Sequence, residues 1–149
     1  MAEGKTVTYE GIMRDLKARK FAPIYYLMGD ESYYIDKIAD YIAENVLQPE
    51  ERDFNQTVLY GADVTAAEIV DTAKRYPMMS EYQVVIVKEC QAKSDVVNKL
   101  HTYVSQPSPT TILVLCFRGA QAKGKDLLPA AKKTGVVFES KPLKNSEMD

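Results

Sequence analysis

The run Thr111–Phe117 (TILVLCF) limits the fold more than any other stretch of this 149-residue chain. Seven consecutive residues without a charge are typical of a strand that is covered on both faces. Two further apolar runs, Ile24–Met28 and Val84–Val87, have the same character. Because strands buried on both faces belong to parallel sheets flanked by helices, the sequence predicts an α/β fold with three layers.

Helical segments separate these runs. Thr8 is expected to cap a short helix, and the clearest apolar stripe follows the first strand and ends before Pro49. Thr65-Ala-Ala-Glu68 has the pattern of a capping box, and its helix is expected to stop before Pro77. The apolar stripes of these three helices are Tyr9, Ile12, Met13 and Leu16, then Ile35, Ile38, Ala39, Ile42 and Val46, then Ala66, Ile69, Val70 and Ala73.

The second half of the chain continues the alternation. Ser94 is expected to cap a helix that carries Val97, Leu100, His101 and Val104 on one side. Asp126–Lys133 is predicted to be a short helix closed by Gly135. Asp53–Tyr60, polar enough for an edge, and Val136–Glu139 bring the predicted strands to five. Together these segments predict a mostly parallel five-stranded sheet, with few topologies open to it because crossovers are right-handed.

Composition excludes several classes of function. The chain has 19 basic and 21 acidic residues, so its net charge of −2 gives no sign of a nucleic-acid binder. No apolar run approaches the roughly 18 residues that span a bilayer, and the N-terminus lacks the apolar region of a secretory signal, so no membrane partner is expected. Cys90 and Cys116 lack metal-ligand spacing, which predicts reduced thiols, no metal site and a cytoplasmic location.

The turn after the first strand, Gly29-Asp30-Glu31-Ser32, stands where α/β proteins usually bind ligands, at the carboxyl edge of the sheet. A phosphate-binding turn would read G-x-x-x-x-G-K-S/T, with glycines for close backbone approach and a lysine for the phosphates. Here one glycine precedes two acidic residues, and the next lysine is Lys37, on the helix. We therefore expect Asp30 or Ser32 to cap this helix and Glu31 to complement its dipole.

A phospho-receiver domain is an alternative reading of the same turn. Its Mg²⁺ site would use the acidic pair, with Lys141-Pro142 after the last strand. That chemistry also needs an aspartate at the end of the central strand, where this sequence has Lys88-Glu89. A nucleotide-binding domain that uses the same Asp30-Glu31 turn is the other form of this alternative. Lys123-Gly124-Lys125 could touch phosphate, but a glycine between lysines in a loop is a very weak signal and favours a solvated turn. His101, the only histidine, lies on an apolar stripe and is expected to be structural, so no catalytic group assembles.

The segment Tyr76-Pro77-Met78-Met79-Ser80-Glu81 lies between a helix end and a buried strand. Adjacent residues of a regular element cannot both face the core, so at least one methionine is expected to point outward. Methionine is common on adaptable binding surfaces and also fills gaps in cores. The residues alone leave both roles open for Met78 and Met79.

An ordered set of segments resembles the delta subunit of the bacterial DNA polymerase III clamp loader. The likeness begins with the Pro-x-Tyr-Tyr, apolar and Gly-Asp-Glu pattern of 23–35. It continues through Asp53-Phe54, the helix that ends at Arg75, the Pro77 segment and its strand, and 100–115. It closes with 135–139 and Pro142-Leu143. No single motif is as specific as a Walker A box, so the resemblance rests on the order of the set across residues 20–143.

The resemblance implies an AAA+-like core without a functional Walker A motif, in which Gly29, Asp30, Glu31 and Ser32 are purely structural. It also implies binding to the ring-shaped sliding clamp (the beta subunit) and help in opening it. The family's contact is an apolar pair before the third strand, usually Leu-Phe, and Met78 and Met79 occupy those positions. Pro77, Ser80 and Tyr82 would shape this loop.

The same resemblance implies other partners and excludes cofactors. Other clamp-loader subunits would bind the full-length protein and hydrolyse ATP, and DNA would be met only through the assembled loader. The domain itself is expected to be non-catalytic, within a holoenzyme whose chemistry is DNA-directed DNA synthesis. The expected organisation is a lead-in and short helix over 1–20, a clamp-binding domain over 21–143 and a polar tail over 144–149 at a truncation point. We also expect the Met78-Met79 loop to lie along the same edge of the fold as the Gly29 turn.

Overall fold

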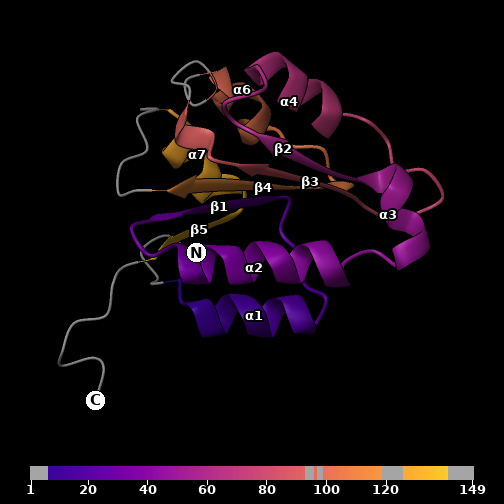
Figure 1. Cartoon of the computed structure of the whole chain (residues 1–149), viewed down its shortest axis with the longest axis horizontal. Coiled ribbons are helices and arrows are strands. Elements are labelled where there is room, and N and C mark those ends of the chain that lie inside the picture. The colour runs from indigo at the N-terminus through magenta and orange to yellow at the C-terminus, as the bar shows by residue number, and fades with distance from the viewer. Residues whose placement is uncertain (1–6, 93–95, 97–98, 119–125, 141–149) are drawn as a thin grey trace.

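Five parallel strands form one sheet in the order β2-β3-β4-β1-β5. The computed structural model describes residues 7–92, 96, 99–118 and 126–140 (Figure 1). The strands are β1 Ile24–Gly29, β2 Gln56–Tyr60, β3 Gln83–Lys88, β4 Thr111–Arg118 and β5 Val136–Ser140. The helices are α1 Tyr9–Lys17, α2 Ser32–Asn45, α3 Pro49–Asn55, α4 Ala66–Ala73, α6 His101–Ser105 and α7 Leu127–Thr134, with a 3₁₀ turn, η1, at Cys90–Ala92.

Helices cover both faces of the sheet, as the apolar strands require. Helices α1 and α2 lie on one face and α4, α6 and α7 on the other (Figure 1). Alternate residues of β1 serve the two sides, because Tyr26 packs with the α4–α6–α7 layer while Tyr25 and Leu27 pack with α1 and α2. Every residue of β4 from Thr111 to Phe117 is buried. The predicted three-layer α/β sheet is confirmed, and its strand pairs are all parallel.

Two predicted helix starts are made by the expected side chains. The Thr8 hydroxyl oxygen accepts a hydrogen bond from the Gly11 amide at 3.0 Å. Thr65 and Glu68 form a reciprocal capping box, with the Glu68 amide 3.1 Å from the Thr65 hydroxyl and the Thr65 amide 2.8 Å from the Glu68 carboxylate. Each cap satisfies amide groups that the first helical turn leaves without partners.

One element differs from the prediction. Residues 53–55 belong to α3 and not to a strand, and β2 begins only at Gln56. Pro49 is the first residue of α3, where its missing N–H is no loss, and the Glu51 carboxylate accepts from the Gln48 amide at 2.9 Å. The proline that marks the end of one helix therefore also starts the next. The predicted edge position of β2 is confirmed.

Some expectations fall outside the described residues. They are the Ser94 cap, the side chain of Val97, the loop Lys123-Gly124-Lys125, the pair Lys141-Pro142 and the tail over 144–149. Among the described helices, none has the length and apolarity needed to cross a membrane.

Candidate binding site

The Gly29 turn is a site of close backbone packing. Gly29 has a φ of 134°, and a Cβ atom there would lie 1.9 Å from the Ser140 carbonyl oxygen and 2.7 Å from the Ser140 amide nitrogen. Met28 pairs with Glu139 in the parallel register, which brings the end of β5 alongside Gly29. Glycine is required here because any side chain would meet the backbone of β5.

The first turn of α2 binds a carboxylate from its own chain. Glu31 is the N-cap residue, and its Oε2 accepts a hydrogen bond from the Tyr33 amide at 3.0 Å. The expectation that Asp30 or Ser32 caps this helix is therefore wrong, because Glu31 combines the capping and the charge-compensating roles. In phosphate-binding folds the amides at this helix end hold the ligand. The ammonium group of Lys37 lies over the Tyr33 ring, 5.4 Å from the ring centroid, and not at the Gly29 turn.

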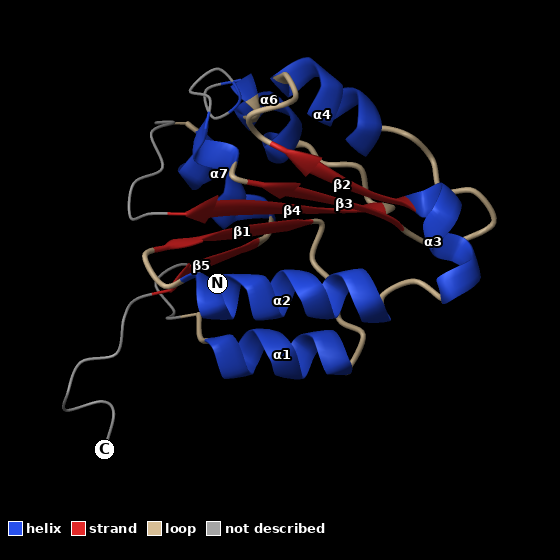
Figure 2. Cartoon of the chain, viewed as in Figure 1, coloured by secondary structure: helices blue, strands red, loops and turns tan. Residues whose placement is uncertain are grey.

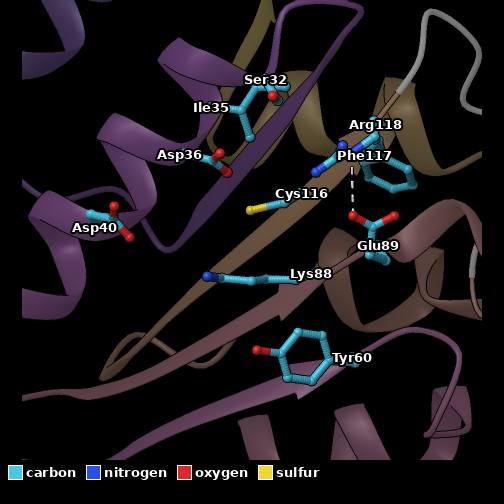
Figure 3. Close-up of a pocket in the computed structure, with 10 residues that line it drawn as sticks. All are labelled: Ser32, Ile35, Asp36, Asp40, Tyr60, Lys88, Glu89, Cys116, Phe117 and Arg118. Carbon is cyan, nitrogen blue, oxygen red and sulfur yellow. Dashed lines mark ion pairs between the residues drawn. The ribbon is translucent and has the colours of Figure 1, made fainter.

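A pocket of about 360 Å³ lies between α2 and the carboxyl ends of β2, β3 and β4 (Figure 3). Three carboxylates and two cations line it, so its walls have a formal charge of −1, which disfavours a polyphosphate. The Glu89 carboxylate already has partners: Arg118 Nε lies 3.3 Å from its Oε2, and the side-chain Nε2 of Gln91 donates to its Oε1 at 2.7 Å. The lining residues are Ser32, Ile35, Asp36, Asp40, Tyr60, Lys88, Glu89, Cys116, Phe117 and Arg118.

The strand order speaks against the receiver alternative. Receiver domains have the order 2-1-3-4-5, with the first strand next to the second and third. Here β1 lies between β4 and β5, and β3 ends in Lys88-Glu89 with no phosphate-accepting aspartate. The topology and the missing aspartate together exclude receiver chemistry at the Gly29 turn.

The two cysteines are core residues, as predicted. Burial raises the pKa of the Cys116 thiol to about 12, although Lys88 acts in the opposite direction. Burial also raises the pKa of Cys90 well above its ordinary value. Both thiols therefore stay protonated near neutral pH, which disfavours a nucleophilic role. In the part of the chain that the structure describes, no group of three or more His, Cys, Asp or Glu side chains is placed to hold a metal ion.

The Met78-Met79 loop is the most exposed apolar feature among the described residues. Met79 is 99% exposed and Met78 60% exposed, so neither fills a gap under the sheet. Tyr76, just before Pro77, and Phe54, at the end of α3, are exposed as well. A cluster of uncovered apolar side chains on neighbouring segments is typical of a surface that binds another protein.

Hydrogen bonds hold this loop in one conformation. The buried carboxamide of Asn55 binds both backbone groups of Met78: its Oδ1 accepts from the Met78 amide at 2.6 Å, and its Nδ2 donates to the Met78 carbonyl at 2.9 Å. Ser80 Oγ donates to the Tyr82 carbonyl at 3.1 Å and accepts from its amide. The Tyr82 ring packs edge-to-face on Phe21, with the ring centroids 5.5 Å apart.

The sequence pointed to Met78, Met79, Pro77, Ser80 and Tyr82, and the structure places all five on this loop. Reasoning from the sequence missed Asn55 and Phe54 because they fell in a predicted strand. The position of the loop was also predicted wrongly. The loop precedes β3, so it lies at the amino edge of the parallel sheet, whereas the Gly29 turn follows β1 at the carboxyl edge. Figure 2 shows α3, which carries Asn55, at the end of the sheet away from the arrowhead of β4.

Fold and site together define an AAA+-like α/β domain whose first strand-turn-helix unit lacks phosphate-binding chemistry and whose amino edge presents an apolar loop. Comparison with known proteins identifies the family. The sequence profile of the family described as DNA polymerase III, delta subunit, matches residues 25–141. The chain belongs to this family, a clamp-loader subunit family of DNA replication.

Individual relatives agree with this assignment. The chain is 28% identical over 146 residues to DNA polymerase III subunit delta of Bacillus subtilis, covering 91% of this chain and 42% of the relative. It superimposes on a solved structure of the Bacillus subtilis DNA clamp loader delta protein with a TM-score of 0.84 at 27% identity, covering 94% of this chain and 44% of that one.

A DNA polymerase III gamma subunit-related protein from Thermotoga maritima shares the fold, with a TM-score of 0.56 at 22% identity over 95% of this chain and 48% of that one. The chain therefore spans less than half the length of each of these relatives.

Proposed function

We propose that this domain binds the DNA polymerase III sliding clamp through Met78 and Met79 and helps to open the ring for loading onto DNA. The observation that carries the proposal is the exposure of both side chains on a loop whose backbone is fixed by hydrogen bonds to the buried Asn55 side chain. Membership of the delta family supplies the partner. In this family an apolar pair before the third strand makes the contact. The two methionines lie in the loop before β3, with three residues between Met79 and the start of the strand at Gln83.

The energetics suit a compact contact. Burying an exposed methionine side chain contributes about 1.5–3 kcal/mol, less about 0.5–1.5 kcal/mol for the rotamers that become fixed. Methionine is more flexible than the usual Leu-Phe pair, so a larger share of this gain is offset by side-chain ordering. A backbone that is ordered before binding limits the remaining loss of entropy.

Ring opening follows from differential affinity. A bound protein shifts an equilibrium only by as much as it prefers one state to the other. We propose that the Met78-Met79 loop binds the open form of the clamp more tightly than the closed form. ATP hydrolysis then belongs to other clamp-loader subunits, and DNA is met through the assembled loader. The proposed clamp-binding domain spans residues 21–143. The proposed location is the cytoplasm, where bacterial chromosomes are replicated.

The test is calorimetric titration of the cognate clamp with this chain and with Met78→Ala/Met79→Ala. The double variant is expected to lose measurable binding and to keep its melting temperature within a few degrees, because neither side chain is buried. Tyr33→Ala is the matched control, since Tyr33 is 55% exposed but lies on α2 at the carboxyl edge. A large loss of stability with binding retained would show that the pair supports the fold and that the site is elsewhere.

A further inference from the structure

The side chain of Asn55, at the end of α3, forms hydrogen bonds to a loop outside its own helix. It is 2% exposed, and both amide hydrogens and the carbonyl oxygen of its side chain are used. One N–H donates to the Glu51 carbonyl, one turn back in α3, at 2.9 Å. The other donates to the Met78 carbonyl, while Oδ1 accepts from the Met78 amide. A single side chain thus joins the end of α3 to a loop residue 23 positions further along the chain.

The residue after this connection has a strained backbone. Met79 has a φ of 56°, in the left-handed region that residues with a Cβ seldom adopt. Such a conformation persists only where the surroundings determine it, and such sites are often functional. Asn55 fixes the residue before Met79, and the Ser80 hydroxyl fixes the residues after it through Tyr82. The outcome is a methionine side chain that extends fully into solvent at a defined position.

We propose that Asn55 is the positioning residue of the clamp-binding loop: its carboxamide holds the Met78 backbone so that Met79 is presented in its binding conformation before the clamp arrives. This inference rests on the proposed function. Asn55 itself is buried and does not touch the clamp; it acts through Met78. Without its side chain the loop populates several conformations, and binding must select one of them, which weakens the observed affinity by the fraction of competent molecules.

The experiment compares Asn55→Ala with Thr134→Val, using the whole 149-residue chain and the cognate clamp. Thr134→Val also removes side-chain hydrogen bonds, to the Val104 and Ala130 carbonyls, but it acts on α7 without touching the loop. Urea unfolding measures stability, calorimetry measures clamp affinity, and amide hydrogen exchange of Met78 measures the loop in the absence of the clamp. If Asn55→Ala fails to fold, Asn55→Ser replaces it, because a hydroxymethyl group cannot span both backbone groups.

We expect Asn55→Ala to bind the clamp about tenfold more weakly, the scale of one or two side chains left to be ordered on binding. Met78 amide exchange should accelerate, while Thr134→Val should keep wild-type affinity at similar or lower stability. Wild-type affinity in a folded Asn55 variant, with binding abolished by Met78→Ala/Met79→Ala, overturns the positioning role and leaves the proposed function intact. Retained binding in the double variant itself overturns the proposed function, and the Asn55 role with it.

Discussion

Replacing Gly29 by alanine tests whether the first turn of the sheet is a packing site. The added Cβ would meet the carbonyl oxygen and amide nitrogen of Ser140 at 1.9 and 2.7 Å. These are backbone atoms at the end of β5 and cannot rotate away as a flexible side chain could. The substitution must therefore both strain its own backbone, at a φ of 134°, and displace the end of the neighbouring strand.

The expected loss of stability follows from these two effects. A non-glycine residue in such a conformation costs about 1–3 kcal/mol, and displacing the end of β5 weakens its pairing with β1 and the packing of Phe138, which is 6% exposed. We expect the free energy of unfolding to fall by about 3 kcal/mol, a size that needs a specific cause of this kind. For a domain of this length this corresponds to a drop of roughly 6–12 °C in melting temperature.

Urea unfolding followed by circular dichroism measures this loss, with Asp30→Ala as the control. Asp30 is the next residue but is exposed, so its replacement should change stability by less than about 0.5 kcal/mol. Clamp affinity of the folded Gly29→Ala protein should stay at the wild-type value, because the Met78-Met79 loop lies at the other edge of the sheet. An unchanged unfolding midpoint would refute the assignment of Gly29 to strand packing.

Three further predictions concern the thiols, the nucleotide and the rim of the loop. The pKa of Cys116 is about 12 in the folded protein and near 9 in the unfolded chain, because burial disfavours the thiolate. The protonated thiol therefore contributes its full share of stability below pH 9. Stability should therefore fall between about pH 9 and 12, and Cys116→Ala should reduce the slope of unfolding free energy against pH; an equally steep slope would contradict the burial argument. Millimolar Mg-ATP should leave the melting temperature unchanged in a thermal-shift assay, since Glu31 occupies the helix end; a reproducible rise would restore a nucleotide site. Phe54→Ala should weaken clamp binding less than Met79→Ala in the same titration, because Phe54 is 70% exposed beside the loop and not at its tip; a larger loss would move the centre of the contact to α3.

The buried strands and the starts of α1 and α4 could be predicted because their signals are local. The uncharged run 111–117 is stable only where both of its faces are buried. The Thr65–Glu68 pattern contains both partners of the hydrogen bonds that start α4. Helix α3 was missed because Pro49 serves both as a stop and as a first helical residue. A proline signal alone does not separate these roles. The missed indication in the sequence was Glu51, whose carboxylate accepts from the Gln48 amide at the start of α3.

The candidate site was predicted in part. Met78 and Met79 were identified, but only the fold shows that both are exposed. The edge on which they lie could have been deduced, since a loop that leads into a parallel strand lies at the amino edge. Asn55 could not have been found, because its partner Met78 is 23 residues away and only the folded structure brings the end of α3 next to this loop.

The Gly29 turn and the Met78-Met79 loop thus divide two roles between opposite edges of one sheet. At the carboxyl edge the strand-turn-helix unit is present, but the Glu31 carboxylate accepts from the first turn of α2 and the backbone of β5 packs against Gly29. At the amino edge the exposed side chains of Met78 and Met79 lie on a loop whose backbone is hydrogen-bonded to Asn55.

Oxidative footprinting can locate the clamp contact on the unaltered chain. Hydrogen peroxide converts exposed methionine to its sulfoxide, and mass spectrometry measures the rate at each site. The half-buried Met13 on α1 serves as the internal reference. A saturating amount of cognate clamp should slow oxidation of Met78 and Met79 and leave Met13 unchanged, whereas unaltered rates at Met78 and Met79 in the bound complex would contradict the account.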